Sequence, residues 1–379
     1  MELRPLGAGN LQVSRISLGA MSFGSGFTRE TVIDDDLAAV LVNRAIDAGV
    51  NLIDTADTYG GTFGTSETVL GRVLRNRRDE VLLATKVGYG DLGPNVLTYD
   101  NVIAGCEGSL SRLGVDTIDL YQLHRPDRSV PLEESLRALE DLVTRGLVRE
   151  FGVSNYRAFE VAGAVARQRA LGRQSISSVQ IQYSLVSRDV EHEILPHCRT
   201  DAIGVLVFQP LASGQLTGWR DTRGARGRRR LGILDAAGPE NLPRARAVVD
   251  AIARARGVSM AQVALGWVLA QPGITSAIVG PSNLTQLDDS LLAADLVLEA
   301  EELVDLDAAT ALPPIYPASS DRSMGFLEPG DLSPPSTGRS PDDAPWLAQN
   351  ATPQGAPSGT PGRPGDDAAR TPPARDATT

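Results

Sequence analysis

The chain has 379 residues, 42% of them hydrophobic and 22% charged, which is enough for one large single-core domain or two medium ones and excludes a short disulfide-stapled peptide. Its 36 basic and 47 acidic residues give a formal charge of -11, so a basic surface for nucleic acid or anionic lipid is not expected. We expect a small molecule as partner; the sequence does not indicate an oligomeric state.

Two cysteines, Cys106 and Cys198, are too few for a disulfide framework. The first ten residues contain no apolar core of signal-peptide length, and no apolar run is long enough to span a bilayer. Together these features predict a reduced, cytoplasmic setting.

The N-terminal residues 3–15 alternate apolar and polar side chains around a Gly-Ala-Gly-Asn turn, which predicts a hairpin. Eight short apolar runs follow, each typical of a buried strand. They are residues 15–21, 51–56, 82–86, 118–124, 149–155, 178–183, 204–210 and 276–280.

The segments between these runs have helical spacing of apolar residues, as at Val102, Cys106, Leu110 and Leu113. Several of them end at a glycine shortly before the next strand, a typical helix C-cap. Eight β-then-α units in about 300 residues favour an α/β fold of the (β/α)8 TIM barrel type. An open doubly wound sheet would carry a dinucleotide signature in its first unit, where none occurs. The hairpin could close the bottom of such a barrel.

The composition changes at about residue 316. Residues 317–379 hold 12 of the 24 prolines and only five residues from the set Val, Ile, Leu, Met and Phe. Such a segment cannot bury enough apolar surface to offset the entropy of ordering. We therefore predict a barrel domain over 1–316 and a disordered Pro-rich tail over 317–379.

Lys86 is the one lysine among the 36 basic residues; the other 35 are arginines. Arginine can replace lysine as a surface charge, but not as a compact or titratable ammonium, because guanidinium is planar, forked and permanently charged. Lys86 is therefore a candidate site residue before any motif is considered. The alternative interpretation is that Lys86 has no function and escaped by chance a general replacement of lysine by arginine in this sequence.

Polar residues end three consecutive predicted strands: Asp54 and Tyr59 follow the second, Lys86 the third and His124 the fourth. In a parallel barrel these strand ends meet at one mouth. Taken singly, each residue has a structural explanation, such as a turn aspartate or a packing tyrosine. Their conjunction favours a catalytic site, and we predict no metal there.

These motifs, D-T-A-x-x-Y-G, T-K and Q-L-H in register, resemble the aldo-keto reductase superfamily over about residues 1–310. Other segments, such as GTFGTSETVLG, are similar to its bacterial, potassium-channel-β-like branch. The resemblance implies NADPH-dependent interconversion of an aldehyde or ketone and its alcohol. Tyr59 would be the general acid, Lys86 would lower its pKa, Asp54 would anchor Lys86, and His124 would orient the carbonyl.

The resemblance also implies cofactor contacts. Ser154, Asn155 and Gln180 would hold the nicotinamide carboxamide, and Phe208 would stack on its ring. The following loop would lie along the pyrophosphate through Gln209, Pro210, Leu211, Gly214 and Leu216. Around the adenosine end, the corresponding positions are Gly280, Ser282, Gln286 and Asp289.

This last segment lacks the cationic clamp for a 2′-phosphate that the family commonly has. Arg230, in the arginine-rich stretch 219–232, could supply that charge. The missing clamp weakens, without reversing, the preference for NADPH that the resemblance implies, and NADH is possible. Candidate apolar contacts for the substrate are Met21, Phe23, Tyr89 and Trp219.

Two further functions stay open at the level of sequence. The chain could be an NADPH-binding regulatory or sensing subunit with little turnover, because the channel-β branch uses this scaffold for binding. Alternatively, Lys86 could form a Schiff base, as in a barrel aldolase.

Overall fold

The computed structural model describes residues 1–24, 33–89, 96–218, 241–317 and 319–320. Contacts divide the chain into a compact unit, Met1–Pro334, and a second unit, Pro335–Thr379. The second unit and nearly all of the predicted tail lie outside the described residues, so the tail and its boundary at residue 316 stay predictions.

Eight parallel strands form a closed barrel, which confirms the predicted (β/α)8 fold. Each of the eight apolar runs contains or overlaps one strand. Around the barrel the order is β10-β3-β4-β5-β6-β7-β8-β9. The strands are β3 (Ile16–Gly19), β4 (Leu52–Asp54), β5 (Leu82–Val87), β6 (Ile118–Leu123), β7 (Val148–Ser154), β8 (Ser178–Gln182), β9 (Gly204–Phe208) and β10 (Ile274–Val279).

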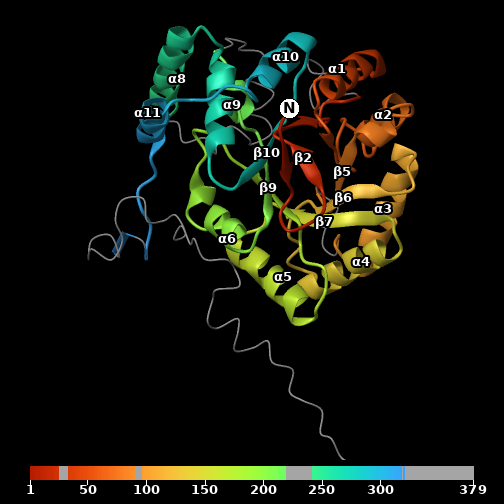
Figure 1. Cartoon of the computed structure of the whole chain (residues 1–379). Helices are drawn as coiled ribbons and strands as arrows, with labels where there is room; N and C mark the ends of the chain where they lie inside the picture. The colour runs from red at the N-terminus through yellow and green to blue at the C-terminus, as the bar shows by residue number, and fades with distance from the viewer. Residues whose placement is uncertain (25–32, 90–95, 219–240, 318, 321–379) are drawn as a thin grey trace, which may run out of the picture. The chain divides into compact units, whose positions relative to one another are not determined.

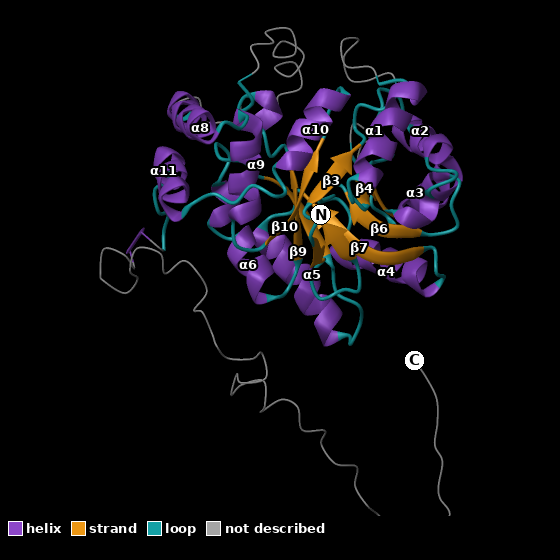
Figure 2. Cartoon of the chain, turned by 45° about the horizontal axis from the view of Figure 1, so that its top comes forward, coloured by secondary structure: helices purple, strands orange, loops and turns teal. Residues whose placement is uncertain are grey.

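Helices surround the strands in Figures 1 and 2. They are α1 (Asp35–Asp47), α2 (Thr65–Val73), α3 (Tyr99–Leu113), α4 (Leu132–Thr144), α5 (Ala158–Ala170), α6 (Ile194–Thr200), α8 (Leu242–Arg256), α9 (Met260–Ala270), α10 (Leu284–Leu292) and α11 (Ala300–Thr310). Short 3₁₀ turns are η1 (Arg78–Glu80), η2 (Asp189–Glu191) and η3 (Ala212–Gly214). No described helix is long and apolar enough to cross a membrane.

Helix α3 illustrates how local sequence sets an element. The Thr98 hydroxyl accepts a hydrogen bond from the Asn101 amide and so caps the first turn. The predicted apolar positions, spaced three or four apart, are all buried. The helix ends at Gly114, whose φ of 66° is left-handed and suits glycine. The chain then enters β6 within a few residues.

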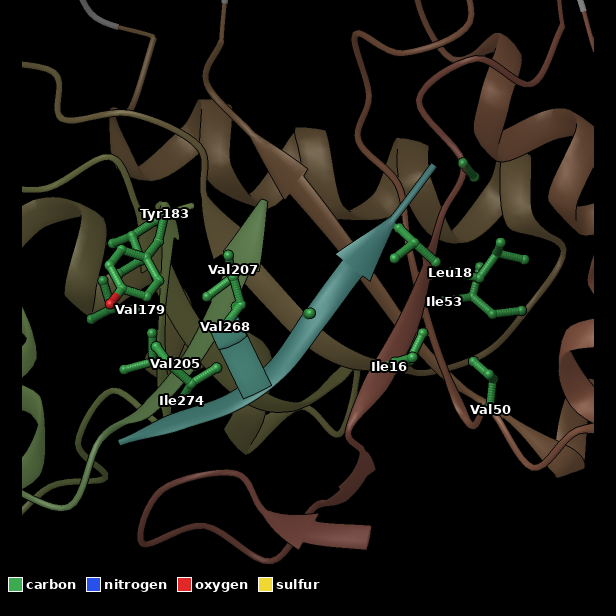
Figure 3. Packing of buried hydrophobic residues seen from close by; sticks show 14 of the residues in the cluster. Ile16, Leu18, Val50, Ile53, Val179, Tyr183, Val205, Val207, Val268 and Ile274 are labelled. Carbon is green, nitrogen blue, oxygen red and sulfur yellow. The ribbon is translucent and has the colours of Figure 1, made fainter. Parts of the chain in front are cut away.

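Two apolar layers hold the barrel together. The larger lies between strands and helices, and Figure 3 shows part of it, including Ile16 and Leu18 of β3 beside Ile53 of β4. The smaller fills the barrel interior. It joins Leu6, Leu11 and Val13 of the N-terminal segment to inward-facing residues of the strands, namely Leu52, Ala84, Leu120, Leu206 and Ile278. Alternation along each strand separates the two layers.

The predicted hairpin is present as β1 (Leu3–Pro5) paired antiparallel with β2 (Gln12–Ser14). Its apolar residues cover the end of the barrel opposite the strands' carboxyl ends. The buried carboxylate of Glu150, near the start of β7, accepts hydrogen bonds from the Asn10 amide at 2.5 Å and the Leu11 amide at 3.2 Å. Glu150 therefore fastens the hairpin turn to the barrel.

Replacing Glu150 with alanine should lower the free energy of unfolding by about 1–3 kcal/mol, because two amides lose their buried acceptor. Glu150→Gln keeps a carbonyl oxygen as acceptor, so its free energy of unfolding should fall less than that of Glu150→Ala. Urea unfolding of the three proteins measures this difference. Equal losses in both variants would show that the amide hydrogen bonds do not carry the effect.

Candidate active site

Strand order brings the predicted catalytic residues to one end of the barrel. Asp54 is the last residue of β4, Lys86 the last but one of β5, and His124 follows β6 directly. These strands are neighbours: Asp54 is in register with Ala84, and Lys86 with Gln122. The loop between β4 and α2 adds Tyr59.

Lys86 and Asp54 form an ion pair inside the protein. The Lys86 Nζ lies 2.6 Å from Asp54 Oδ1, and the two residues are 0% and 3% exposed. The same ammonium donates to the Thr55 carbonyl at 2.8 Å. Burial lowers the pKa of Lys86, while the Asp54 carboxylate opposes that shift. The carboxylate therefore keeps a buried ammonium charged.

Gln180, on β8, holds the other oxygen of this carboxylate. Its Nε2 donates to Asp54 Oδ2 at 2.8 Å. Asp54 thus has a donor on each oxygen and cannot rotate without losing one of them. The position of Lys86 is fixed through it.

The Tyr59 hydroxyl lies between the lysine and the histidine. Its oxygen is 3.5 Å from Lys86 Nζ and 3.4 Å from His124 Nε2. The Lys86 ammonium is also 4.8 Å from the centre of the Tyr59 ring, and that ring meets the His124 ring edge-on at 82°. Four side chains predicted from the sequence therefore converge on one point.

The pKa of Tyr59 departs from the expectation. The sequence predicts that Lys86 lowers this pKa, but burial, followed by the negative charge of Asp54, raises it well above 10. Burial dominates because the hydroxyl is removed from water while Asp54 balances the lysine charge. The expected lowering is therefore wrong for this state of the site. Tyr59 carries its proton at neutral pH.

His124 is neutral at physiological pH. Burial, followed by the charges of Lys86 and Arg125, moves its pKa well below 6.5. Its carbonyl accepts a hydrogen bond from Asn155 Nδ2 at 3.0 Å, while the buried Nδ1 has no partner among the described residues. A neutral imidazole carries one N–H, and its tautomer decides whether Nε2 donates or accepts.

Asp57 is a buried carboxyl that the sequence analysis missed. It is 2% exposed, and its Oδ1 has no partner in the described part of the chain. Burial and the neighbouring Glu67 carboxylate raise the pKa of Asp57 to about 7. Glu67 itself bonds to Thr85 and Arg112. The D-T-A-D-T-Y segment shows an acid beside Tyr59, but not its burial.

Asp57→Asn should change how stability depends on pH. The pKa of Asp57 is higher in the folded chain, so the folded state holds this proton more tightly and loses stability as pH rises from about 4 to about 7. Asparagine does not titrate, so the variant does not lose stability in this way. The free energy of unfolding of the variant should therefore rise relative to that of the parent as pH increases from about 4 to about 7. Urea unfolding at several pH values measures the gain. Parallel curves for the two proteins would contradict it.

The residues expected to hold the nicotinamide carboxamide lie next to this cluster. Ser154 ends β7, and its hydroxyl donates to the Gln180 carbonyl at 3.0 Å. Asn155 follows with a left-handed φ of 62° and donates to both Ser154 and His124. A left-handed asparagine costs energy that a functional site often tolerates. The cofactor roles of these residues stay predictions.

The loop after β9 has an unusual backbone. Gln209, Ala212 and Ser213 all have left-handed φ values, between 50° and 55°, in the segment that contains η3. A loop whose residues adopt such left-handed conformations in close succession can point its backbone N–H groups into a concave surface that binds an anion. The expected pyrophosphate contacts are in or beside it: Phe208, Gln209, Leu211 and Gly214 are partly buried, while Pro210 and Leu216 are buried.

The expected adenosine contacts surround the start of α10. Gly280 and Ser282 are exposed, and the Ser282 amide and hydroxyl both donate to Gln286 Oε1 at 2.9 Å. Asp289 instead faces α9, because its oxygens accept from Ser259 and Gln262. Arg230 lies outside the described residues.

The expected substrate wall is only partly supported. Met21 and Tyr89 are exposed, as a contact surface requires. Phe23 is 0% exposed and belongs to the main core, so its assignment as a substrate contact was wrong. Its place after β3 suggested a mouth residue, but the chain there turns inward, with Phe23 N bonded to the Ala20 carbonyl. Trp219 lies outside the described residues.

The structure defines a closed parallel barrel whose mouth holds a buried Lys–Asp pair beside a tyrosine and a histidine. The chain belongs to the aldo/keto reductase family, whose model matches residues 15–311. It is 34% identical over 318 residues to the uncharacterized oxidoreductase YrpG of Bacillus subtilis (strain 168), covering 80% of this chain and 94% of that protein.

A second relative confirms the resemblance to the channel-β-like branch. It is described as a probable voltage-gated potassium channel subunit beta, from Oryza sativa subsp. japonica. The two proteins are 32% identical over 323 residues, which cover 80% of this chain and 95% of the relative. The family and the first relative support an oxidoreductase that acts on small molecules, and this family typically binds a nicotinamide cofactor.

Proposed function

We propose that this protein interconverts an aldehyde or ketone and the corresponding alcohol with NADPH. The observation that carries the proposal is the Tyr59 hydroxyl, which lies 3.5 Å from a buried ammonium and 3.4 Å from an imidazole nitrogen. Carbonyl reduction needs a proton at oxygen when hydride reaches carbon. When bound, the nicotinamide cofactor supplies the hydride.

Tyr59 gives its proton to the substrate oxygen. Because its pKa is raised, the Tyr59 hydroxyl remains protonated at neutral pH and can act as the proton donor. The cost is a tyrosinate left in a buried site, and the Lys86 ammonium stabilises that product electrostatically. Lys86 thus acts on the charged state that forms during the reaction, while Asp54 and Thr55 hold its ammonium in place.

His124 orients the carbonyl. In the tautomer with the proton on Nε2, it donates a hydrogen bond toward the oxygen that Tyr59 protonates, where negative charge develops. Asn155 fixes the main chain at this residue through the His124 carbonyl. Because its pKa is low, the imidazole remains a neutral donor and does not compete with Tyr59 as the acid.

The residues present fit a dinucleotide. The strained backbone after β9 and the N-terminus of α10 follow adjacent strands at the same end of the barrel, and both suit phosphate groups. Ser154, Asn155 and Gln180 offer amide and hydroxyl groups for a carboxamide. We assign NADPH over NADH on the family pattern, although residues 280–290 hold no arginine or lysine.

The proposal includes a cytoplasmic setting, which the free thiols of Cys106 and Cys198 support. A Schiff-base role for Lys86 has less support. Its ammonium is fully buried and donates to Asp54 and Thr55, whereas an amine nucleophile needs a free lone pair.

A second candidate function rests on the rice relative described as a channel subunit. In that case the chain binds NADPH and reports its presence to a partner protein, with little turnover. The complete set of Asp54, Tyr59, Lys86 and His124 favours the enzyme.

Fluorescence titration with NADPH and NADH, followed by a panel of aldehydes and ketones with the tighter-binding nucleotide, separates the two functions. We expect nucleotide oxidation that depends on the carbonyl compound. Tight binding with no oxidation across the panel would support the regulatory subunit. No binding of either nucleotide would contradict both.

A further inference from the structure

Three side chains form a connected row at the mouth of the barrel: His124, Tyr89 and Arg125. The Tyr89 ring lies 4.4 Å from the His124 ring, tilted by 34°. The Arg125 guanidinium carbon lies 5.3 Å from the centre of the same Tyr89 ring. The guanidinium is therefore within about 10 Å of the His124 ring centre. A short molecule can reach from one to the other.

Within the described residues, no carboxylate neighbour neutralises the charge of Arg125. Arg125 is exposed, and no Asp or Glu in the described part of the chain forms an ion pair with it. Arg128, three residues later in the same loop, has its own carboxylate 3.5 Å away in Glu160. In a chain with a formal charge of -11, an exposed cation beside the candidate active site with no carboxylate partner among the described residues is a specific feature.

The chemistry of this cation is selective. Its guanidinium carbon lies over the Tyr89 ring, and the planar group offers five N–H donors in a fork that matches the oxygens of a carboxylate or phosphate. This cation–π contact with Tyr89 reduces the freedom that the side chain would lose on binding. Arg125 is thus prepared to bind an acid group on a molecule whose carbonyl lies at Tyr59 and His124.

We propose that Arg125 determines specificity by binding an acid group on the substrate. The preferred substrates are short carbonyl compounds that carry a carboxylate or a phosphate. The carbonyl oxygen of the substrate lies at Tyr59 and His124, and its carbon chain crosses the exposed Tyr89 ring. The acid group of the substrate pairs with Arg125. This inference rests on the proposed carbonyl reduction for the position of the reacting end.

Matched substrates test the proposal on the full-length protein. 4-Oxobutanoate and butanal have the same carbon chain with and without a carboxylate; glyceraldehyde 3-phosphate and glyceraldehyde make the same comparison for phosphate. We expect that, in at least one pair, the charged compound has a higher kcat/KM than its neutral partner. Which pair shows this difference tells whether the site prefers a carboxylate or a phosphate. Arg125→Met should lower kcat/KM for that acid roughly ten-fold or more, mainly through KM, and leave its neutral partner unchanged.

Three controls make the result specific. Arg125→Lys should keep part of the effect, because the charge remains without the fork. Arg128→Met removes a nearby exposed charge and should leave the preference unchanged. Rising salt should lower kcat/KM for the charged compound but not for the neutral one, because salt screens the exposed ion pair between Arg125 and the acid group of the substrate. Equal effects of Arg125→Met on both members of each pair would overturn the proposal.

A binding measurement separates this proposal from the proposed function. Succinate has two carboxylates and no carbonyl to reduce, so titrating it into the parent and Arg125→Met by NMR does not depend on turnover. Succinate binding that is lost in Arg125→Met, without reduction of any carbonyl compound, would refute the reductase and retain the anion site. Reduction without discrimination by charge, and without succinate binding, would refute the anion site and retain the reductase.

Discussion

Tyr59→Phe should lower kcat for carbonyl reduction by about 10²- to 10⁴-fold, the usual contribution of a positioned general acid. The variant loses only the hydroxyl that lies between Lys86 and His124, and the ring can keep its contacts with both. NADPH affinity should therefore stay close to that of the parent. Steady-state kinetics and fluorescence titration of the same preparations measure the two quantities.

Tyr121→Phe is the matched control. Tyr121 is fully buried, whereas Tyr59 is partly buried, and the Tyr121 hydroxyl has no hydrogen-bond partner among the described residues. Its removal should change neither turnover nor cofactor affinity. A Tyr59→Phe protein that turns over as fast as Tyr121→Phe would exclude Tyr59 as the proton donor.

Lys86→Met should abolish measurable turnover and destabilise the fold by about 3–5 kcal/mol, because the Asp54 carboxylate stays buried without its counter-ion. Asp54→Asn combined with Lys86→Met removes both charges and should recover most of the stability without recovering activity. Lys86→Arg keeps the charge, but its fork cannot reproduce the compact contacts to Asp54 and Thr55, so turnover should remain low.

Urea unfolding and kcat, measured for the parent and these three variants, separate stability from chemistry. The informative comparison is the double variant, which should be folded and inactive. A stable Lys86→Met protein with parental turnover would show that the buried ion pair supports neither the fold nor the reaction.

Much of the barrel could be predicted because it depends on local pattern. The apolar runs and the glycine C-caps, such as Gly114, indicate strand and helix ends without any knowledge of tertiary contacts. Parallel strand order then required Asp54, Lys86 and His124 to share a mouth. The single lysine in the composition pointed to the same place.

Properties that depend on burial and on distant contacts could not be predicted. Tyr59 has a raised pKa because the folded chain removes it from water. The pKa of Asp57 depends on Glu67 of α2, whose own position depends on Arg112 of α3. Glu150 caps a turn 139 and 140 residues away, and Asp289 bonds to α9. No spacing in the sequence identifies these partners.

Label transfer tests the central claim most directly. The protein is mixed with NADPH that carries deuterium at the transferable position of the nicotinamide, together with an aldehyde, and the alcohol is analysed by mass spectrometry. We expect one deuterium on the carbon of the former carbonyl, formed at a rate that falls sharply in Tyr59→Phe. Tight NADPH binding without any deuterated alcohol would contradict carbonyl reduction by this site.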